Sequence, residues 1–206
     1  MRKPLFLVGM MGCGKSTMAA QLSRLTGAPR LDLDEEIERR EGRTIPSIFA
    51  ADGDAGFRLC ETAALRAVCE GTPHIVATGG GIVTRQENID LMRAHGTVIW
   101  LCRPLEDMVR DVRQDTRPNL AGDKAERMRT LYAAREPLYR AAAHIAFSNH
   151  MPPHQAAQQL LRMLEAKTGG QKCAVWTRAG NAPAEHVYEK NRFQPDGWLS
   201  AVLRLG

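Results

Sequence analysis

Residues 4–17 read PLFLVGMMGCGKST, an apolar run that passes directly into a turn rich in glycine. Gly9 to Ser16 fit the pattern G-x-x-x-x-G-K-S/T, and Leu5 to Val8 form the apolar strand that this pattern requires in front of it. Glycines let the backbone wrap phosphate groups with its N–H groups pointing inward, and the following helix presents its positive end to the same anion. The stretch therefore predicts a strand, a phosphate-binding loop and a helix.

Two side chains of this loop have predicted chemical roles. Lys15 is placed to reach the β- and γ-phosphates of a nucleotide, and Ser16 to offer its hydroxyl to Mg²⁺. Cys13 lies beside the N-terminus of the predicted helix, which can lower the pKa of a thiol, but no partner for thiol chemistry is near it and we interpret it as a spacer. The alternative for the whole motif is a glycine turn that binds nothing.

Short apolar runs alternate with helix-length segments along most of the chain. The strand candidates, most of them apolar at successive residues, are Leu5 to Val8, Arg30 to Leu33, Ile75 to Thr78, Val98 to Cys102 and Ile145 to Phe147. Such runs are typical of strands buried on both faces of a parallel sheet. Helical spacing of i, i+3, i+4, i+7 marks Ala157, Leu160, Leu161 and Leu164. The pattern predicts an α/β fold of the P-loop NTPase type, with three layers and a central, mostly five-stranded parallel sheet.

Two carboxylates end the second apolar run, which reads RLDLD over residues 30–34. The side-chain period of two in a strand predicts that Asp32 and Asp34 lie on one side, at the sheet edge where ligands bind. In a nucleotide site, one acid can hold Mg²⁺ or its waters, while the other orients the hydroxyl that attacks the γ-phosphate. The alternative is that both residues cap a helix beginning at Glu35, where acidic side chains are favoured.

A second glycine turn and three arginines complete the candidate site. The run from Ile75 to Thr78 leads into Gly79 to Gly81, where the lack of side chains lets a substrate approach backbone N–H groups. Guanidinium groups bind carboxylate and phosphate in a bidentate way, which makes candidates of Arg58, Arg117 and Arg135. Residues 103–140 mix further arginines with acids, as expected of a solvated lid. For each feature alone, a plain turn or a surface charge is the alternative.

Together these motifs resemble the shikimate kinase family. The resemblance covers about residues 1–167 and rests on GMMGCGKST, LDLD, Phe57-Arg58 with Glu61, TGGG, Arg117-Pro118, and Arg135 followed by Pro137-Leu138-Tyr139. It implies ATP-dependent transfer of a phosphoryl group to the 3-hydroxyl of shikimate, giving shikimate 3-phosphate in chorismate and aromatic amino acid biosynthesis. It also implies Mg²⁺ as cofactor, ATP as co-substrate and a helical lid over the site.

The resemblance implies a role for each candidate residue. Three would be catalytic, with the last brought from the lid onto the transferred phosphate: Lys15, Asp34 and Arg117. Ser16 would hold Mg²⁺, with Asp32 assisting. Shikimate would be bound by Asp34, Arg58, Gly80 and Arg135, flanked by Gly79 and Gly81. ATP would be bound by Gly12, Cys13, Gly14, Lys15, Ser16, Thr17 and Arg117, with adenine beside Arg110 and Pro153. Asp54 and Asn119 depart from the family pattern, which bears on the shikimate-side helix for the first and on the lid for the second, and neither is expected to touch a proposed ligand.

The regular alternation of strand and helix stops near Gly170. We expect residues 1–170 to form the shikimate-kinase-like P-loop domain and residues 171–206 to be a C-terminal extension of unknown role. The tail contains Trp176, Phe193 and Trp198, and aromatic residues of this kind favour packing somewhere.

Composition limits the partners of the protein. The 206 residues carry 28 Lys and Arg against 23 Asp and Glu, and this net charge of +5 fits a small anionic ligand at least as well as nucleic acid. Aromatic residues are 5%, too few for a platform that stacks single-stranded nucleic acid. The five cysteines contain no C-x-x-C pair, which favours a reducing cytoplasm, and no apolar run reaches the length of a membrane span. We expect a cytoplasmic monomer with shikimate and ATP as partners, without nucleic acid or membrane.

Two other functions remain open at this point. A different small-molecule kinase, such as one acting on gluconate, would keep the phosphate loop but has less need for two substrate arginines. A P-loop switch protein would bind nucleotide without phosphorylating a metabolite.

Overall fold

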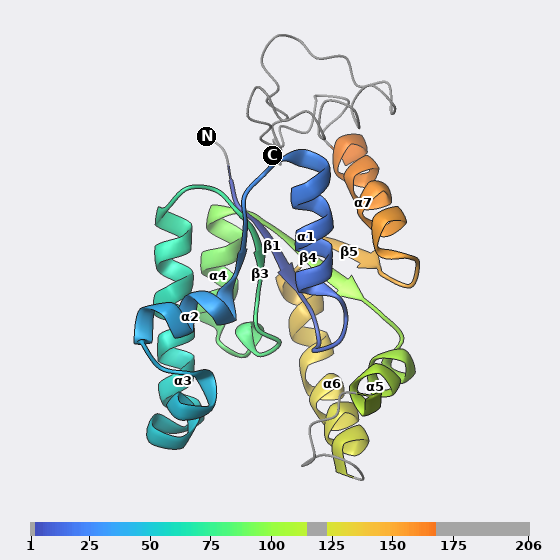
Figure 1. The fold of residues 1–206 in the computed structure, drawn as a ribbon. Coiled ribbons are helices and arrows are strands. Elements are labelled where there is room, and N and C mark those ends of the chain that lie inside the picture. The colour runs from blue at the N-terminus through green and yellow to red at the C-terminus, as the bar shows by residue number, and fades with distance from the viewer. Residues whose placement is uncertain (1–2, 115–122, 168–206) are drawn as a thin grey trace.

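Five strands form one parallel sheet in the computed structural model, which describes residues 3–114 and 123–167 (Figure 1). The strands lie side by side in the order β2-β3-β1-β4-β5, and every neighbouring pair is parallel. In that order their bounds are Arg30–Asp32, Ile75–Ala77, Leu5–Val8, Thr97–Cys102 and Ile145–Ser148. The predicted α/β fold with a five-stranded parallel sheet is confirmed.

The burial of each strand explains the pattern of apolar residues along it. The central strands β1 and β3 are buried at every residue, and β4 is buried at all but its last residue. The edge strand β5 instead alternates between buried and exposed residues. Continuous apolar runs therefore mark the strands that are covered on both faces. Alternation of buried and exposed residues marks the strand that has one face exposed to solvent.

Helices cover both faces of the sheet (Figure 1). On one face α1 (Lys15–Thr26) packs beside α7 (Pro153–Lys167), which buries Ala157, Leu160 and Leu164. On the other face lie α4 (Gln86–His95) and α6 (Asp123–Ala142). The remaining helices are α2 (Leu33–Glu41) packed on α3 (Ile45–Glu70), and α5 (Leu105–Gln114) packed on α6. No helix in the described part of the chain combines the length and apolar character that crossing a bilayer requires.

Because all five strands are parallel, their carboxyl ends meet at one edge of the sheet. The central strand β1 leads there into the glycine-rich loop, with β3 on one side of it and β4 on the other. β3 leads into Gly79 to Gly81 and a short 3₁₀ helix, η1 (Ile82–Thr84). Later strands of the chain are thus added on both sides of β1. In open α/β sheets, ligands bind in the crevice at the carboxyl ends of the strands where the strand order reverses in this way.

Two parts of the prediction lie outside the described residues. Arg117 belongs to the segment between the end of α5 and the start of α6, which lies within the predicted lid of residues 103–140. The C-terminal extension, residues 171–206, also lies outside them.

Candidate active site

The loop after β1 has a backbone that favours glycine. Gly9 and Gly14 have φ of 143° and 93°, which side chains of L-residues rarely tolerate. A Cβ at Gly9 would also lie 2.8 Å from Cys13 Sγ and 2.9 Å from the carbonyl oxygen of Leu101. These glycines therefore fix the turn, and the chain enters α1 directly after Gly14.

Side chains of the protein donate hydrogen bonds to four carbonyl oxygens of this loop. Lys15 Nζ donates to the carbonyl oxygens of Gly9 and Met10, each at 2.9 Å. Two donors come from the ends of other strands: Arg103 Nη1 lies 2.8 Å from Gly12 O, and Asn149 Nδ2 lies 2.7 Å from Cys13 O. These hydrogen bonds fix the peptide planes of the loop.

Cys13 is a buried residue within this loop. Its side chain is fully buried, and burial raises the pKa of the thiol, although the nearby charge of Lys15 acts in the opposite direction. The helix N-terminus therefore does not lower the pKa of this thiol, because desolvation outweighs the favourable charges. The interpretation of Cys13 as a spacer agrees with this burial.

The carboxylate of Asp32 has one contact with α1 and one with the first turn of α2. Its Oδ2 accepts a hydrogen bond of 2.7 Å from Ser16 Oγ, and its Oδ1 accepts one of 3.1 Å from the backbone N–H of Asp34. The second contact makes Asp32 the N-cap of α2. The two interpretations of this residue, helix cap and neighbour of the hydroxyl that the sequence predicts to hold Mg²⁺, are therefore compatible.

Asp34 reaches the site by a different route from the one predicted. β2 ends at Asp32, so Asp34 lies in the first turn of α2 and not on a strand, and the period-two argument for it is wrong. The carboxyl group is close enough to Lys15, Arg58 and Asp32 for their charges to act on it. Burial, followed by the negative charge of Asp32, raises the pKa of Asp34 above its ordinary value, against the effect of the two cations.

The glycine turn after β3 lies against the charged side chains of α2 and α3. A Cβ at Gly79 would lie 2.9 Å from Glu61 Oε1 and 3.0 Å from Asp34 Oδ1. A Cβ at Gly81 would lie 2.5 Å from Arg58 Nη1. Any side chain at these two positions would displace the charged groups, so the turn requires glycine for its close approach to them.

Two carboxylates on α3 hold Arg58. Glu61 Oε2 accepts a 2.7 Å ion pair from Arg58 Nη1, and Asp54 Oδ1 lies 3.3 Å from Nη2. Asp54, one of the two departures from the family pattern, thus contacts a residue proposed to bind shikimate. Its position one helical turn before Arg58 explains the contact, because residues i and i+4 are neighbours on a helix.

Glu61 is a residue of the motif to which the sequence assigned no role. It is fully buried, and no hydrogen-bond partner among the described residues contacts its Oε1. Burial raises the pKa of its carboxyl group, while Arg58 acts to lower it. The sequence signal for this role is an acid three residues after an arginine on one helix, a spacing that brings the two side chains together. Such a spacing marks Glu61 as the partner that holds Arg58.

Arg135 and Tyr139 approach the same glycine turn from α6. Arg135 Nη1 lies 3.4 Å from the carbonyl oxygen of Gly80, and the hydroxyl of Tyr139 donates to that oxygen at 2.5 Å. The motif Arg135 to Tyr139 thus joins α6 to the turn after β3.

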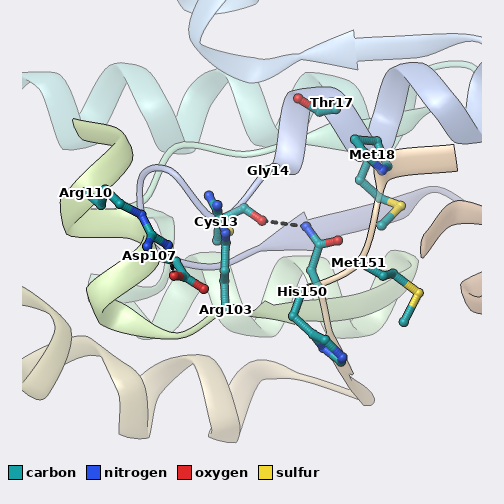
Figure 2. Close-up of a pocket in the computed structure, with 11 residues that line it drawn as sticks. Cys13, Gly14, Thr17, Met18, Arg103, Asp107, Arg110, His150 and Met151 are labelled. Carbon is teal, nitrogen blue, oxygen red and sulfur yellow. Dashed lines mark hydrogen bonds and ion pairs between the residues drawn. The ribbon is translucent and has the colours of Figure 1, made fainter. Parts of the chain in front are cut away.

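A cavity of about 460 Å³ borders the glycine-rich loop (Figure 2). Its wall includes five residues predicted for the ATP site: Cys13, Gly14, Thr17, Arg110 and Pro153. The rest of the wall contains residues that the sequence did not single out: Met18, Arg103, Asp107, Asn149, His150 and Met151. Arg110 is exposed and pairs with Asp107 on α5, and Pro153 begins α7.

The described residues bring nearly all candidates to one edge of the sheet, and Arg117 alone lies outside them. Within residues 3–114 and 123–167 there is no cluster of three or more His, Cys, Asp or Glu able to hold a metal ion. Mg²⁺ does not need such a cluster, because it is commonly bound by one or two protein oxygens together with phosphates and water. The hydroxyl of Ser16 and the carboxylate of Asp32, 2.7 Å apart, are a donor set that fits it.

Comparison with known proteins gives one consistent family. The family model described as shikimate kinase matches residues 11–165. A shikimate kinase of Nitrosomonas europaea is 38% identical over 182 residues, which are 87% of this chain and 84% of that protein. One of Acinetobacter baylyi is 42% identical over 163 residues, covering 78% of this chain and 91% of that protein.

A solved structure gives the same result for the fold. The shikimate kinase from Acinetobacter baumannii in complex with shikimate is 35% identical, with a TM-score of 0.74. The match covers 81% of this chain and 94% of that one.

Proposed function

Because the chain belongs to the shikimate kinase family and phosphorylates shikimate with ATP, we propose that it transfers the γ-phosphoryl group to the 3-hydroxyl at the carboxyl edge of its sheet. The observation that carries the assignment of the site is the convergence of Lys15, Asp34 and Arg58 there. These residues come from α1, α2 and α3, and the charges of Lys15 and Arg58 both act on the carboxyl group of Asp34. The anion-binding loop and an anchored guanidinium thus lie on either side of one carboxylate.

ATP lies along the glycine-rich loop in this proposal. Its phosphates contact the loop from Gly12 to Thr17, and its base enters the cavity bounded by Arg110 and Pro153. Lys15 places its ammonium on the β- and γ-phosphates by exchanging its present contacts with loop carbonyls for phosphate oxygens.

Shikimate lies on the opposite side, between the glycine turn and the helices α3 and α6. Arg58 and Arg135 bind its carboxylate, and the turn from Gly79 to Gly81 lets the ring approach the backbone. A charge-assisted hydrogen bond contributes about 1.5–3 kcal/mol, so two guanidinium groups are sufficient to select an anionic ring.

The residues of the chain perform the proton transfer and stabilise the charge. Asp34 orients the attacking hydroxyl and accepts its proton late, as a weak base whose raised pKa makes it a better acceptor than an ordinary aspartate. Lys15 stabilises the negative charge of the transferred group. Arg117, outside the described residues, is assigned by resemblance to the lid that closes over that group and excludes water.

Mg²⁺ is the proposed cofactor, held by Ser16 with Asp32 behind it. When bound, it neutralises charge on the β- and γ-phosphates. The protein's part is to orient the hydroxyl of Ser16, which Asp32 does through the 2.7 Å hydrogen bond.

Replacing Asp32 with Asn tests this assignment apart from the helix cap. Asn caps helices as well as Asp does, so the melting temperature should change little. The Mg²⁺ concentration for half-maximal activity should rise about 10- to 100-fold, as expected when a partner behind a metal ligand is altered. Magnesium titrations of both proteins at saturating ATP and shikimate give the comparison. An unchanged magnesium requirement would leave Asp32 as a helix cap alone.

The assignment of substrate is tested by following ADP release by the purified chain in the presence of shikimate, gluconate or nucleoside monophosphates. We expect turnover with shikimate only, and ³¹P NMR of the product should show phosphate on the 3-hydroxyl. Turnover with gluconate would support the other small-molecule kinase, and nucleotide binding without turnover would support the switch protein.

We also propose that the kinase domain is residues 1–170, with residues 171–206 as an extension, and that the chain is a monomer in the cytoplasm. The family match, which ends at residue 165, supports the domain boundary. The free thiols of Cys13, Cys60, Cys69 and Cys102 are consistent with a reducing compartment.

A further inference from the structure

Tyr139 on α6 is a buried polar residue that the proposed mechanism does not use. Its side chain is fully buried, and its ring stacks on Trp100 of β4 with centroids 6.3 Å apart and planes at 23°. A buried phenol needs a hydrogen-bond partner. The partner here is the carbonyl oxygen of Gly80, 2.5 Å from the hydroxyl, in the middle of the glycine turn after β3.

This hydrogen bond orients one particular peptide group. In a trans peptide the C=O of Gly80 and the N–H of Gly81 point in opposite directions, so fixing the carbonyl also fixes the N–H. Gly81 lies against the guanidinium of Arg58, since a Cβ there would be 2.5 Å from Nη1. The phenol of α6 therefore sets the direction of a backbone donor that is next to a substrate arginine.

The surroundings of the phenol make this orientation rigid. Trp100 supports the ring from β4, and Met10 Sδ lies 4.0 Å from the hydroxyl. The second donor to the same carbonyl, Arg135, is longer at 3.4 Å and comes from one turn earlier on α6. When Arg135 moves to bind a substrate anion, Tyr139 remains as the contact that holds the turn.

We propose that Tyr139 is a positioning residue for the carboxylate of shikimate: its hydroxyl holds the Gly80–Gly81 peptide so that the N–H of Gly81 and the guanidinium of Arg58 converge on that group. The proposal rests on the proposed function, in which Arg58 and the glycine turn bind shikimate. One helix, α6, would then supply both a side chain for the anion and the orientation of a backbone donor for it.

Replacing Tyr139 with Phe removes one oxygen atom and keeps the ring. We expect the KM for shikimate to rise about tenfold, the loss expected when a buried acceptor loses its donor. The KM for ATP should stay within about twofold, because the glycine-rich loop keeps its own contacts. Tyr132→Phe, on the same helix, is the matched control and should leave both values unchanged.

A neutral analogue separates a positioning role from a structural one. Shikimate methyl ester lacks the negative charge, so the preference of the enzyme for shikimate over the ester, as a ratio of kcat/KM, should fall in Tyr139→Phe. Equal losses for shikimate and the ester, or an equal rise in the KM for ATP, would overturn the proposal.

A measurement on the unaltered chain does not depend on the folding of a variant. In ¹⁵N NMR, the amide resonance of Gly81 should shift strongly when shikimate is added, and less with the ester. An unmoved Gly81 resonance in a chain that turns over shikimate would also overturn the proposal. Absence of shikimate turnover by the unaltered chain would instead reject the proposed function.

Discussion

Asn in place of Asp34 should lower kcat for shikimate phosphorylation by about a thousandfold, within the range that general bases contribute. The amide has nearly the same shape as the carboxylate, but it cannot accept the proton of the attacking hydroxyl. It can still form hydrogen bonds to shikimate, so KM should change by less than about tenfold. Steady-state kinetics with both substrates varied will give the two parameters separately.

The pH dependence of the same reaction follows from the surroundings of Asp34. As the pH falls through the pKa of this group, the carboxylate gains a proton and can no longer act as a base, so kcat/KM falls. Because burial and the charge of Asp32 raise that pKa, the acid limb should lie above the range of an ordinary aspartate. The limb should be absent from the residual activity of the Asn variant.

Glu35 provides the matched control for this prediction. It is the next residue in the first turn of α2 and is exposed, so Glu35→Gln removes the same charge from the same turn without touching the site. Its kinetics should be those of the unaltered chain. Similar kcat losses in the two variants would assign the effect to the charge or stability of α2, and Asp34 would lose its role as base.

The second large effect is expected for Lys15→Met, which should lower kcat about 100- to 1000-fold, the usual cost of removing one donor to transition-state charge. Methionine fills a similar volume but carries no charge for the γ-phosphate. The variant also loses both hydrogen bonds to the loop carbonyls, so its affinity for ATP should fall as well. Isothermal titration with ATP, combined with turnover at saturating ATP, will separate the two losses.

Arg24→Met is the control for the change in charge. Arg24 is an exposed cation in the last turn of the same helix, α1, at the end far from the loop. Its replacement should leave kcat and ATP affinity unchanged. A Lys15→Met variant with nearly full kcat at saturating ATP would show that Lys15 only helps ATP to bind.

The parts of the site that the sequence predicted are those set by local rules. The loop from Gly9 to Ser16 could be predicted because its motif lies in one continuous stretch of sequence and the strand before it is uniformly apolar. The strand ends were also predicted to within one residue, because β1, β3 and β4 are buried on both faces and carry few polar residues. These features depend on residues that are close together in the chain, and a sequence pattern contains that information.

Other contacts depend on segments far apart in sequence. Asn149 holds the carbonyl of Cys13 across 136 residues, and Arg103 holds that of Gly12 across 91. The available signal was position alone, since each follows the end of a parallel strand at the edge where ligands bind. The error on Asp34 was local: Asp32 caps α2 and ends β2 two residues before Asp34, so a helix delivers the second carboxylate.

The carbonyl contacts that Arg103 and Asn149 make with the glycine-rich loop have a consequence for the order of events in turnover. Because Arg103 and Asn149 hold the carbonyls of Gly12 and Cys13, and Lys15 alone changes partners when phosphate binds, this part of the loop already has its shape before any substrate arrives. Little backbone entropy is then lost when a triphosphate docks. Nucleotide can therefore be the first substrate to bind, and shikimate need not be present to organise the nucleotide site.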